Sequence, residues 1–351
     1  GYLRNMSAIT KLVSDTKQAN KTFYRTERLE AQTGNDSMKF NYNGISQFSS
    51  IRNTASSSTL DRLGFKSEGT NLNLRYQNNT IIADSLFGIK YNLSNFDLNK
   101  YGFNHVTSEK TMGLYQNNNA SQLAILTDGI YKNIDFTVNT LDNQTSLLNA
   151  LSGLNLTYFK RAPSQLFDQD AKSLNQRVAK NVSNSNKDFV TITYQVIAPP
   201  HSQLYVSIPN ISWSDDNNHS LSITVNGVTK NQVTDNTFDF FDLGYFETES
   251  MVTIKLSFPG NKAISFDNPS FYALDTQNYQ IAMDTINERD SKVTTSNNKV
   301  FVDYSSKTNA SLFFTIPYDK GWTATINHKK VKIQRAQKGF MKVDVPSGKG
   351  K

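Results

Sequence analysis

The chain has 351 residues, enough for two or three domains; 37% of them are hydrophobic and 19% charged, and Asn, Ser and Thr make up much of the rest. It contains no cysteine, which excludes disulfides, thiolate nucleophiles and cysteine-ligated metals. The formal net charge of +7 either serves solubility alone or favours anionic polymers or anionic lipid headgroups as partners. We see no dense block of Lys and Arg and no reading helix, so we expect no nucleic-acid partner. No run approaches the roughly 20 apolar residues of a membrane-spanning helix.

The first 160 residues alternate between helix and strand signals. One apolar stripe with helical spacing predicts a helix over 5–20, formed by Ile9, Leu12, Val13 and Thr16. Further helices are predicted within 80–93 and 144–156. Strands are predicted at 23–29, within 80–93, at 113–116 and at 123–126. This alternation predicts an α+β module over residues 1–160.

Residues 161–186 are polar and contain Pro163, and we predict a linker there. From residue 187 onward we expect no helix of useful length. Instead, runs of alternating apolar and polar residues predict strands joined by turns. We therefore expect two tandem all-β sandwich domains of jelly-roll-like type, at 187–276 and 277–351.

The two expected sandwiches repeat one another at a distance of about 100 residues, which indicates tandem domains. Residues 203–209 parallel 312–317, residues 222–228 parallel 323–329, and residues 238–243 parallel 340–345. Trp213 parallels Trp322, and such recurring residues are typical of core packing. The first copy adds a closing strand at 251–258 that has no counterpart in the second, so we expect the second sandwich to be truncated at its last strand and the chain to be a fragment.

An aromatic and basic surface in the first module is the candidate binding site. Sugars stack on flat aromatic faces, and the Arg fork binds phosphate or carboxylate. The predicted ligand-binding residues are Tyr24, Arg25, Arg28, Arg52, Arg75 and Tyr76. For Arg25 beside Glu27 on one strand face, a simple structural pair is the other interpretation.

No catalytic or metal motif emerges from the sequence. The four His residues lack a nucleophile-elbow context, and there is no phosphate loop. The run 215–218, Asp-Asp-Asn-Asn, has oxygen ligands for calcium but is more typical of a polar hairpin connection. Asp84 is read either as a helix N-cap or as an acid or base. We expect no catalytic residue, no metal and no cofactor in this chain.

A family resemblance rests on several stretches in a fixed order. They are residues 23–27 (FYRTE), 44–50 (GISQFSS), 83–91 (ADSLFGIKY), 318–322 (YDKGW) with 325–327 (TIN), 340–341 (FM) and 345–348 (VPSG). Together they resemble the C-terminal extracytoplasmic region of the YfhO family of bacterial membrane proteins.

The resemblance implies a polytopic glycosyltransferase of the GT-C type. Such an enzyme transfers a sugar from a polyprenyl-phosphate donor to lipoteichoic acid or a related cell-envelope polymer of Gram-positive bacteria. It also implies that membrane spans precede Gly1, that the chemistry lies in that missing region, and that this chain is at the extracytoplasmic face of the cell membrane. The alternatives are a cell-surface carbohydrate-binding module or adhesin without enzymatic activity, and a structural wall-associated scaffold.

Overall fold

The computed structural model describes residues 2–29, 39–45, 54–68, 73–75, 79–169, 173–174, 178–180, 189–213, 219–234, 240–259 and 264–351. Its chain divides into two compact units. Unit 1 combines residues 1–157 with residues 278–351, and unit 2 is formed by residues 158–277. The fold is mostly β, with an N-terminal helix and several antiparallel sheets, which confirms the predicted fold class.

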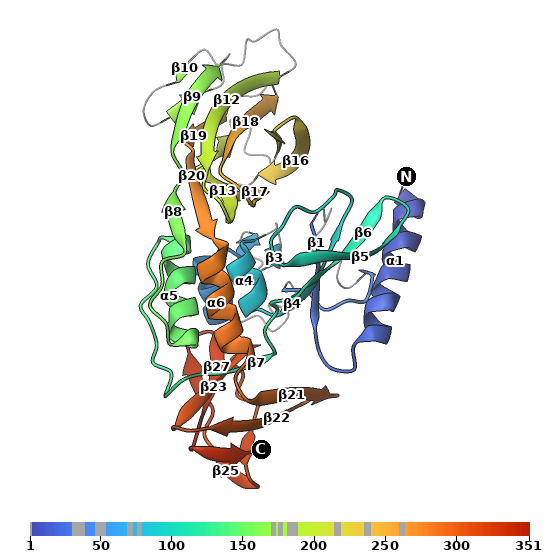
Figure 1. Ribbon diagram of the computed structural model, residues 1–351. Helices are drawn as coiled ribbons and strands as arrows, with labels where there is room; N and C mark the ends of the chain where they lie inside the picture. The colour runs from blue at the N-terminus through green and yellow to red at the C-terminus, as the bar shows by residue number, and fades with distance from the viewer. Residues whose placement is uncertain are drawn as a thin grey trace. The chain divides into compact units, whose positions relative to one another are not determined.

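The elements of unit 1 come from both ends of the chain (Figure 1). The N-terminal part contributes α1 (Tyr2–Ala19), β1 (Arg25–Arg28), α3 (Thr54–Arg62), β2 (Lys66–Glu68), β3 (Asn73–Arg75), α4 (Ile81–Leu86), β4 (Ile89–Ser94), β5 (Phe103–Glu109), β6 (Met112–Asn117), β7 (Ala124–Leu126) and α5 (Thr140–Ser152). The C-terminal part contributes most of α6 (Thr276–Asn287), then β21 (Ser291–Ser296), β22 (Lys299–Ser306), β23 (Ala310–Pro317), β24 (Ala324–Ile326), β25 (Lys329–Val331), β26 (Gln334–Ala336), β27 (Phe340–Val345) and β28 (Gly348–Gly350).

The first sheet has the order β1-β4-β6-β5, with β1 parallel to β4 and the other pairs antiparallel. Helix α1 lies against this sheet (Figure 1). Its stripe of Ile9, Leu12, Val13 and Thr16 is buried, as the helical spacing predicts. Strand β1 is buried at all four residues, and the Asn43 carbonyl accepts a 2.7 Å hydrogen bond from the Thr26 amide of this strand.

Helices α4 and α5 have local capping interactions. The Thr80 hydroxyl accepts from the Ala83 amide and caps α4, and the Asn139 side chain caps α5. Gly153 closes α5 in the left-handed region at φ 74°, where a Cβ would be strained.

Helix α6 corrects the expectation that no useful helix follows residue 187. Its sequence fits a strand as well as a helix. Tyr279 and Met283 are four positions apart, which places them on one face of a strand and also one turn apart on one face of a helix. The structure decides for the helix: Tyr279, Met283 and Ile286 are buried, whereas Ile281 is 52% exposed.

The C-terminal strands of unit 1 form three sheets, with the orders β26-β27-β23-β7, β21-β22-β28 and β24-β25. Strand β7 comes from the N-terminal part and pairs with β23 through Leu126↔Leu312 and Ala124↔Phe314. A core of buried apolar residues, which includes Leu312, Val343 and Val345, lies between these sheets.

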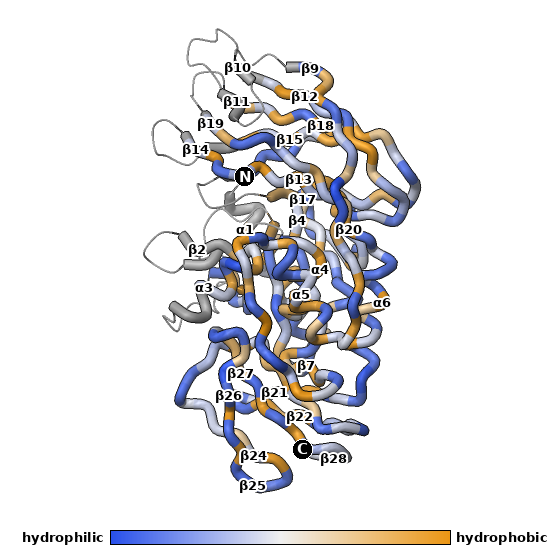
Figure 2. The backbone as a smooth tube through the Cα atoms, turned by 90° about the vertical axis from the view of Figure 1, so that its left-hand side faces the viewer, coloured by the Kyte–Doolittle hydropathy of each residue, from blue (hydrophilic) through white to orange (hydrophobic). Residues whose placement is uncertain are grey.

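Unit 2 is a β-sandwich. Its strands are β8 (Phe159–Arg161), β9 (Ser164–Gln169), β10 (Ser173–Leu174), β11 (Val178–Lys180), β12 (Phe189–Ala198), β13 (Ser202–Ser207), β14 (Ser212–Trp213), β15 (His219–Val225), β16 (Val228–Thr234), β17 (Phe240–Phe246), β18 (Ser250–Pro259), β19 (Ile264–Asp267) and β20 (Ser270–Asp275). They form sheets of order β16-β15-β18-β12-β9, β17-β13-β20-β8 and β10-β11-β19-β14. Hydrophobic and hydrophilic residues alternate along β18, at the centre of its sheet, and its buried residues face the core of unit 2 (Figure 2).

The segment 161–186, which the sequence indicates as a linker, contributes strands to unit 2. Strand β9 pairs with β12, and β11 pairs with β19. The contacts also group residues 278–351 with residues 1–157. The predicted boundaries of a linker at 161–186 and a separate domain at 277–351 stay predictions beside this division.

No helix among the described residues is long and apolar enough to cross a membrane.

Candidate functional site

The structure describes the side chains of three of the six predicted ligand-binding residues. Tyr24 immediately precedes β1, and Arg25 and Arg28 lie on it. Arg75 lies on β3, where only the backbone is described, and Arg52 and Tyr76 lie outside the described residues. The ligand-binding role of the six stays a prediction.

Arg25 is 5% exposed and is bound by protein groups. Its guanidinium donates to the Phe87 carbonyl at 2.7 Å, and to the carbonyl and hydroxyl of Thr315 at 2.7 and 3.2 Å. Burial lowers the pKa of Arg25 to about 10, while the charge of Glu27 acts in the opposite direction. The side chain thus ties β1 to the end of α4 and to β23 and has little surface for an outside ligand.

Tyr24 and Arg28 are also engaged within unit 1. The Tyr24 hydroxyl lies 2.8 Å from the Thr16 hydroxyl, and its ring meets the Tyr91 ring edge to face at 5.7 Å. Arg28 is 6% exposed. Tyr24 therefore connects α1 to the first sheet, and the face of the sheet on which these residues lie is largely covered.

Glu27 is a buried carboxylate in the same strand. It accepts a hydrogen bond from the Ile45 amide, and it packs on Gly44, where a Cβ would lie 2.8 Å from its Oε1. Burial raises the pKa of Glu27 to about 8; the hydrogen bond from Ile45 lowers it, the charge of Asp84 raises it and that of Arg25 lowers it. Near neutral pH a large part of Glu27 is therefore protonated.

Asp84 corrects one of its two sequence interpretations. The N-cap of α4 is Thr80, and Asp84 lies inside the helix with no exposed surface. Its carboxylate forms an ion pair with Lys100, a residue that the sequence reading did not single out. Lys100 also donates to Asn92 Oδ1 at 2.9 Å and lies over the Phe103 ring at 4.3 Å.

Asp84 and Lys100 form a buried ion pair inside unit 1. The side chains of both Asp84 and Lys100 are 0% exposed, so a substrate has no path to them in this structure. Among the residues that the structure describes, no group of three His, Asp or Glu side chains could hold a metal. The calcium candidate at 215–218 lies outside those residues.

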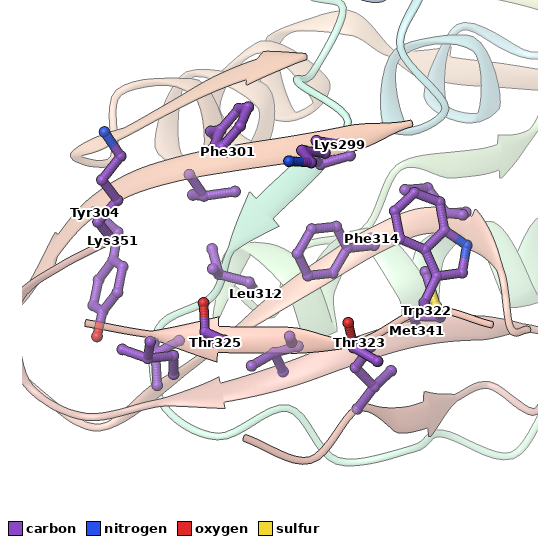
Figure 3. A pocket seen from close by; sticks show the side chains of 18 of the residues that line it. Lys299, Phe301, Tyr304, Leu312, Phe314, Trp322, Thr323, Thr325, Met341 and Lys351 are labelled. Atoms are coloured by element: carbon purple, nitrogen blue, oxygen red, sulfur yellow. The ribbon is translucent and has the colours of Figure 1, made fainter. Parts of the chain in front are cut away.

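A pocket of about 700 Å³ lies in the C-terminal part of unit 1. Strand β22 forms one wall, β24 faces it, and β23 and β27 form the floor (Figure 3). Its apolar lining consists of Val300, Phe301, Val302, Leu312, Phe314, Ile316, Trp322, Ala324, Ile326, Ile333, Met341, Val343 and Val345. Trp322 lines this pocket and is half-buried, whereas the side chain of Trp213 is not described. Lys299, His328 and Lys351 also line it, and all three are exposed.

The net positive charge of the chain lies in one C-terminal segment, which also contributes residues to this pocket. Residues 320–351 hold nine of the 37 Lys and Arg residues but one of the 30 Asp and Glu residues. This segment, the basic segment below, thus carries a formal charge of +8, and the other 319 residues together carry −1. Eight of its nine cations are exposed; Lys342 is buried and pairs with Asp344 at 3.0 Å. The basic segment does not stand out as a dense block in the sequence, because its cations are spread over 32 positions.

Comparison with known proteins gives one match over the whole chain and a few weak structural ones. The family model described as "Bacterial membrane protein YfhO" matches residues 1–351. No curated protein matches the chain.

The match with a family two carbohydrate esterase from Cellvibrio japonicus covers 32% of this chain and 34% of the esterase chain, at 10% identity and a TM-score of 0.20. The match with a cycloisomaltooligosaccharide glucanotransferase from Paenibacillus sp. covers 56% of this chain and 45% of the glucanotransferase chain, at 7% identity and a TM-score of 0.23. The chain thus spans less than half the length of either protein, and at these TM-scores the likenesses carry no argument.

The ion pair between Asp84 and Lys100 predicts strongly coupled mutations. Lys100→Met leaves a carboxylate buried without its cation, and we expect it to lower the free energy of unfolding by about 3–5 kcal/mol. The double variant Asp84→Asn/Lys100→Met removes both charges and should cost less than the sum of the two single changes. Urea unfolding of the unmodified chain, Asp84→Asn, Lys100→Met and the double variant measures these costs. Strictly additive costs would contradict the prediction.

Glu27 predicts a pH dependence of stability. Its pKa is about 8 in the folded chain, against an ordinary value of 4.5, so between these pH values the folded chain binds more protons than the unfolded chain. The free energy of unfolding therefore falls as the pH rises through this window. In the unmodified chain this fall lowers the free energy of unfolding by about 4 kcal/mol by pH 8. Glu27→Gln should remove it.

Urea unfolding at pH 5, 6, 7 and 8 tests this prediction. The exposed Glu288→Gln is the matched control and should keep the pH dependence of the unmodified chain. Equal pH dependence in Glu27→Gln and the unmodified chain would show that Glu27 titrates normally.

Proposed function

Because the chain belongs to the YfhO family of bacterial membrane proteins over its whole length, we propose that it is the extracytoplasmic part of a polytopic membrane glycosyltransferase. The enzyme transfers a sugar from a polyprenyl-phosphate donor to lipoteichoic acid or a related anionic cell-envelope polymer. The catalytic residues lie outside this chain, and the part described here binds the acceptor polymer.

The concentration of charge in the basic segment is the observation that supports acceptor binding. A field of one sign attracts a polymer of the opposite sign and raises its local concentration. The hairpin β24–β25 carries Lys329 and Lys330, and Lys332 follows it; all three are exposed. An exposed cation contributes about 1 kcal/mol or less to a contact, so affinity needs many of them together, as a repeating polyanion provides.

The basic segment also suits this role better than the surface expected on the first module. Arg25 and Arg28 are 5% and 6% exposed, and the guanidinium of Arg25 donates to three protein groups. A polyanion cannot reach such groups without unfolding the strand that carries them. We therefore propose that the basic segment supplies most of the affinity for the acceptor.

Titration of polyglycerol phosphate into the purified chain tests the proposal. We expect binding at low salt that weakens as salt is added, because exposed charges are screened within about 10 Å at 0.1 M ionic strength. The triple variant Lys329→Glu/Lys330→Glu/Lys332→Glu should weaken binding by at least about tenfold, since three contacts of up to about 1 kcal/mol each become repulsive.

A control with the same net charge separates a site from overall attraction. Lys17→Glu/Lys21→Glu/Lys160→Glu also lowers the formal net charge from +7 to +1, but at exposed residues outside the basic segment. It should keep most of the affinity. Equal losses in both variants would contradict a site on the basic segment. Binding to neutral glycan alone would favour the carbohydrate-binding module, and binding only to anionic vesicles would favour attachment to the membrane surface.

A further inference from the structure

The place of the pocket in unit 1 corresponds to the place of a strand in unit 2. One sheet of unit 2 has the order β16-β15-β18-β12-β9, with β18 at its centre. Unit 1 repeats the flanking elements in two separate sheets, the hairpin β24–β25 and the sheet β21-β22-β28. The hydrogen bonds and strand pairings of the two units make β24 and β25 the counterparts of β15 and β16, and β22 the counterpart of β12.

Two pairs of hydrogen bonds align the units residue by residue. In unit 2, the hairpin residue Asn226 donates its amide to the Thr253 carbonyl at 3.0 Å, and its Oδ1 accepts from the Thr253 amide at 3.0 Å. In unit 1, Asn327 does the same with Lys351, at 3.0 and 3.1 Å. Both Asn residues have positive φ, 47° and 48°. Lys351 therefore stands at the position of Thr253.

The pairing on the other side gives the same alignment. In unit 2, Val252 pairs with Val196 and Met251 with Ile197. In unit 1, Gly350 pairs with Tyr304, and Lys349 with Ser305. Gly350 stands where unit 2 has Val252, because the Tyr304 ring occupies the space that a Cβ would need. Thus β28 matches the first residues of β18, which continues for six residues past Thr253, to Pro259.

Those six residues complete the sandwich of unit 2. Ile254, Leu256 and Phe258 are 0%, 0% and 1% exposed and belong to its core. Ile254 pairs with Tyr194 on β12 and with Val225 on β15. The strand therefore satisfies two neighbouring edges and fills the space between the sheets.

The counterparts of its neighbours line the pocket of unit 1. Val302 and Val300 on β22 correspond to Tyr194 and Ile192, and Ile326 and Ala324 on β24 correspond to Val225 and Ile223. In the described part of the chain, residues 299–303 pair only with β21, and β24 pairs only with β25. Two strand edges thus border an apolar space (Figure 3).

We propose that this pocket is the slot for one β-strand, which continues β28 between β22 and β24 with apolar residues at alternate positions. The inserted strand would join the two sheets into one of the same order as in unit 2. A peptide fits this place because both edges offer backbone N–H and C=O groups, which an acyl chain cannot satisfy. The register that β28 begins makes the polypeptide directly after Lys351 its source, and the alternation needed is the one that β18 shows.

A grafted strand tests the proposal. The chain is extended after Lys351 by Ile-Lys-Leu-Ser-Phe-Pro, the sequence of residues 254–259. We expect Tm to rise by at least about 4 °C, and amide hydrogen exchange at residues 299–303 and 324–326 to slow by at least about tenfold. The matched control, Ser-Lys-Ser-Ser-Ser-Pro, has the same length without the apolar face and should change neither.

Several outcomes would overturn the proposal. Unchanged exchange at both edges in the extended chain would show that no strand enters the slot, and equal effects of both extensions would show that the apolar alternation is irrelevant. Protection in the unextended chain that grows with protein concentration would make a second copy the occupant. Protection of the same amides by dodecyl phosphate, equal to that from the graft, would make the pocket a lipid site.

Discussion

The guanidinium of Arg25 joins three parts of unit 1 that are far apart in sequence. It lies on β1 and donates to the carbonyl of Phe87, after α4, and to Thr315 on β23, a residue 290 positions away. A buried cation destabilises a fold unless its donors are satisfied. Its partners are mainly backbone carbonyls, whose positions depend on the whole unit. The N-terminal sheet, helix α4 and the C-terminal sheet must therefore be in place together, which is consistent with residues 1–157 and 278–351 forming one unit.

Other buried polar groups extend this connection. Lys100 pairs with Asp84 and donates to Asn92, and the Ser85 hydroxyl lies 2.5 Å from the Tyr279 hydroxyl on α6. Satisfied buried polar groups of this kind specify their partners more narrowly than apolar contacts do. Burial also explains why these groups belong to the architecture. A binding role needs accessible cations, and residues 320–351 carry eight exposed ones with a single acidic residue beside them.

The basic segment and the pocket beside it have different roles in our proposals. The exposed cations of the basic segment suit a polymer outside the protein, whereas the apolar pocket beside them suits a strand inside it. The two occupants do not compete, since filling the slot leaves Lys329, Lys330 and Lys332 exposed on and beside the hairpin. A closed sheet would hold that hairpin by a second edge and fix the position of its lysines, so a strand in the slot would organise the polymer-binding surface.

Local patterns in the sequence determined several features of this protein. The stripe of Ile9, Leu12 and Val13 indicated α1, and the repeat with Asn226 and Asn327 indicated two related β-structures whose hairpins the structure matches in hydrogen bonding. The ordered motifs also indicated the family. Tertiary structure alone decided that Arg25 is buried, that Asp84 pairs with Lys100, that β7 joins β23 and that α6 is a helix. The physical reason is range: periodicity acts between residues a few positions apart, whereas burial, ion pairing and strand pairing depend on partners that only the folded chain brings together.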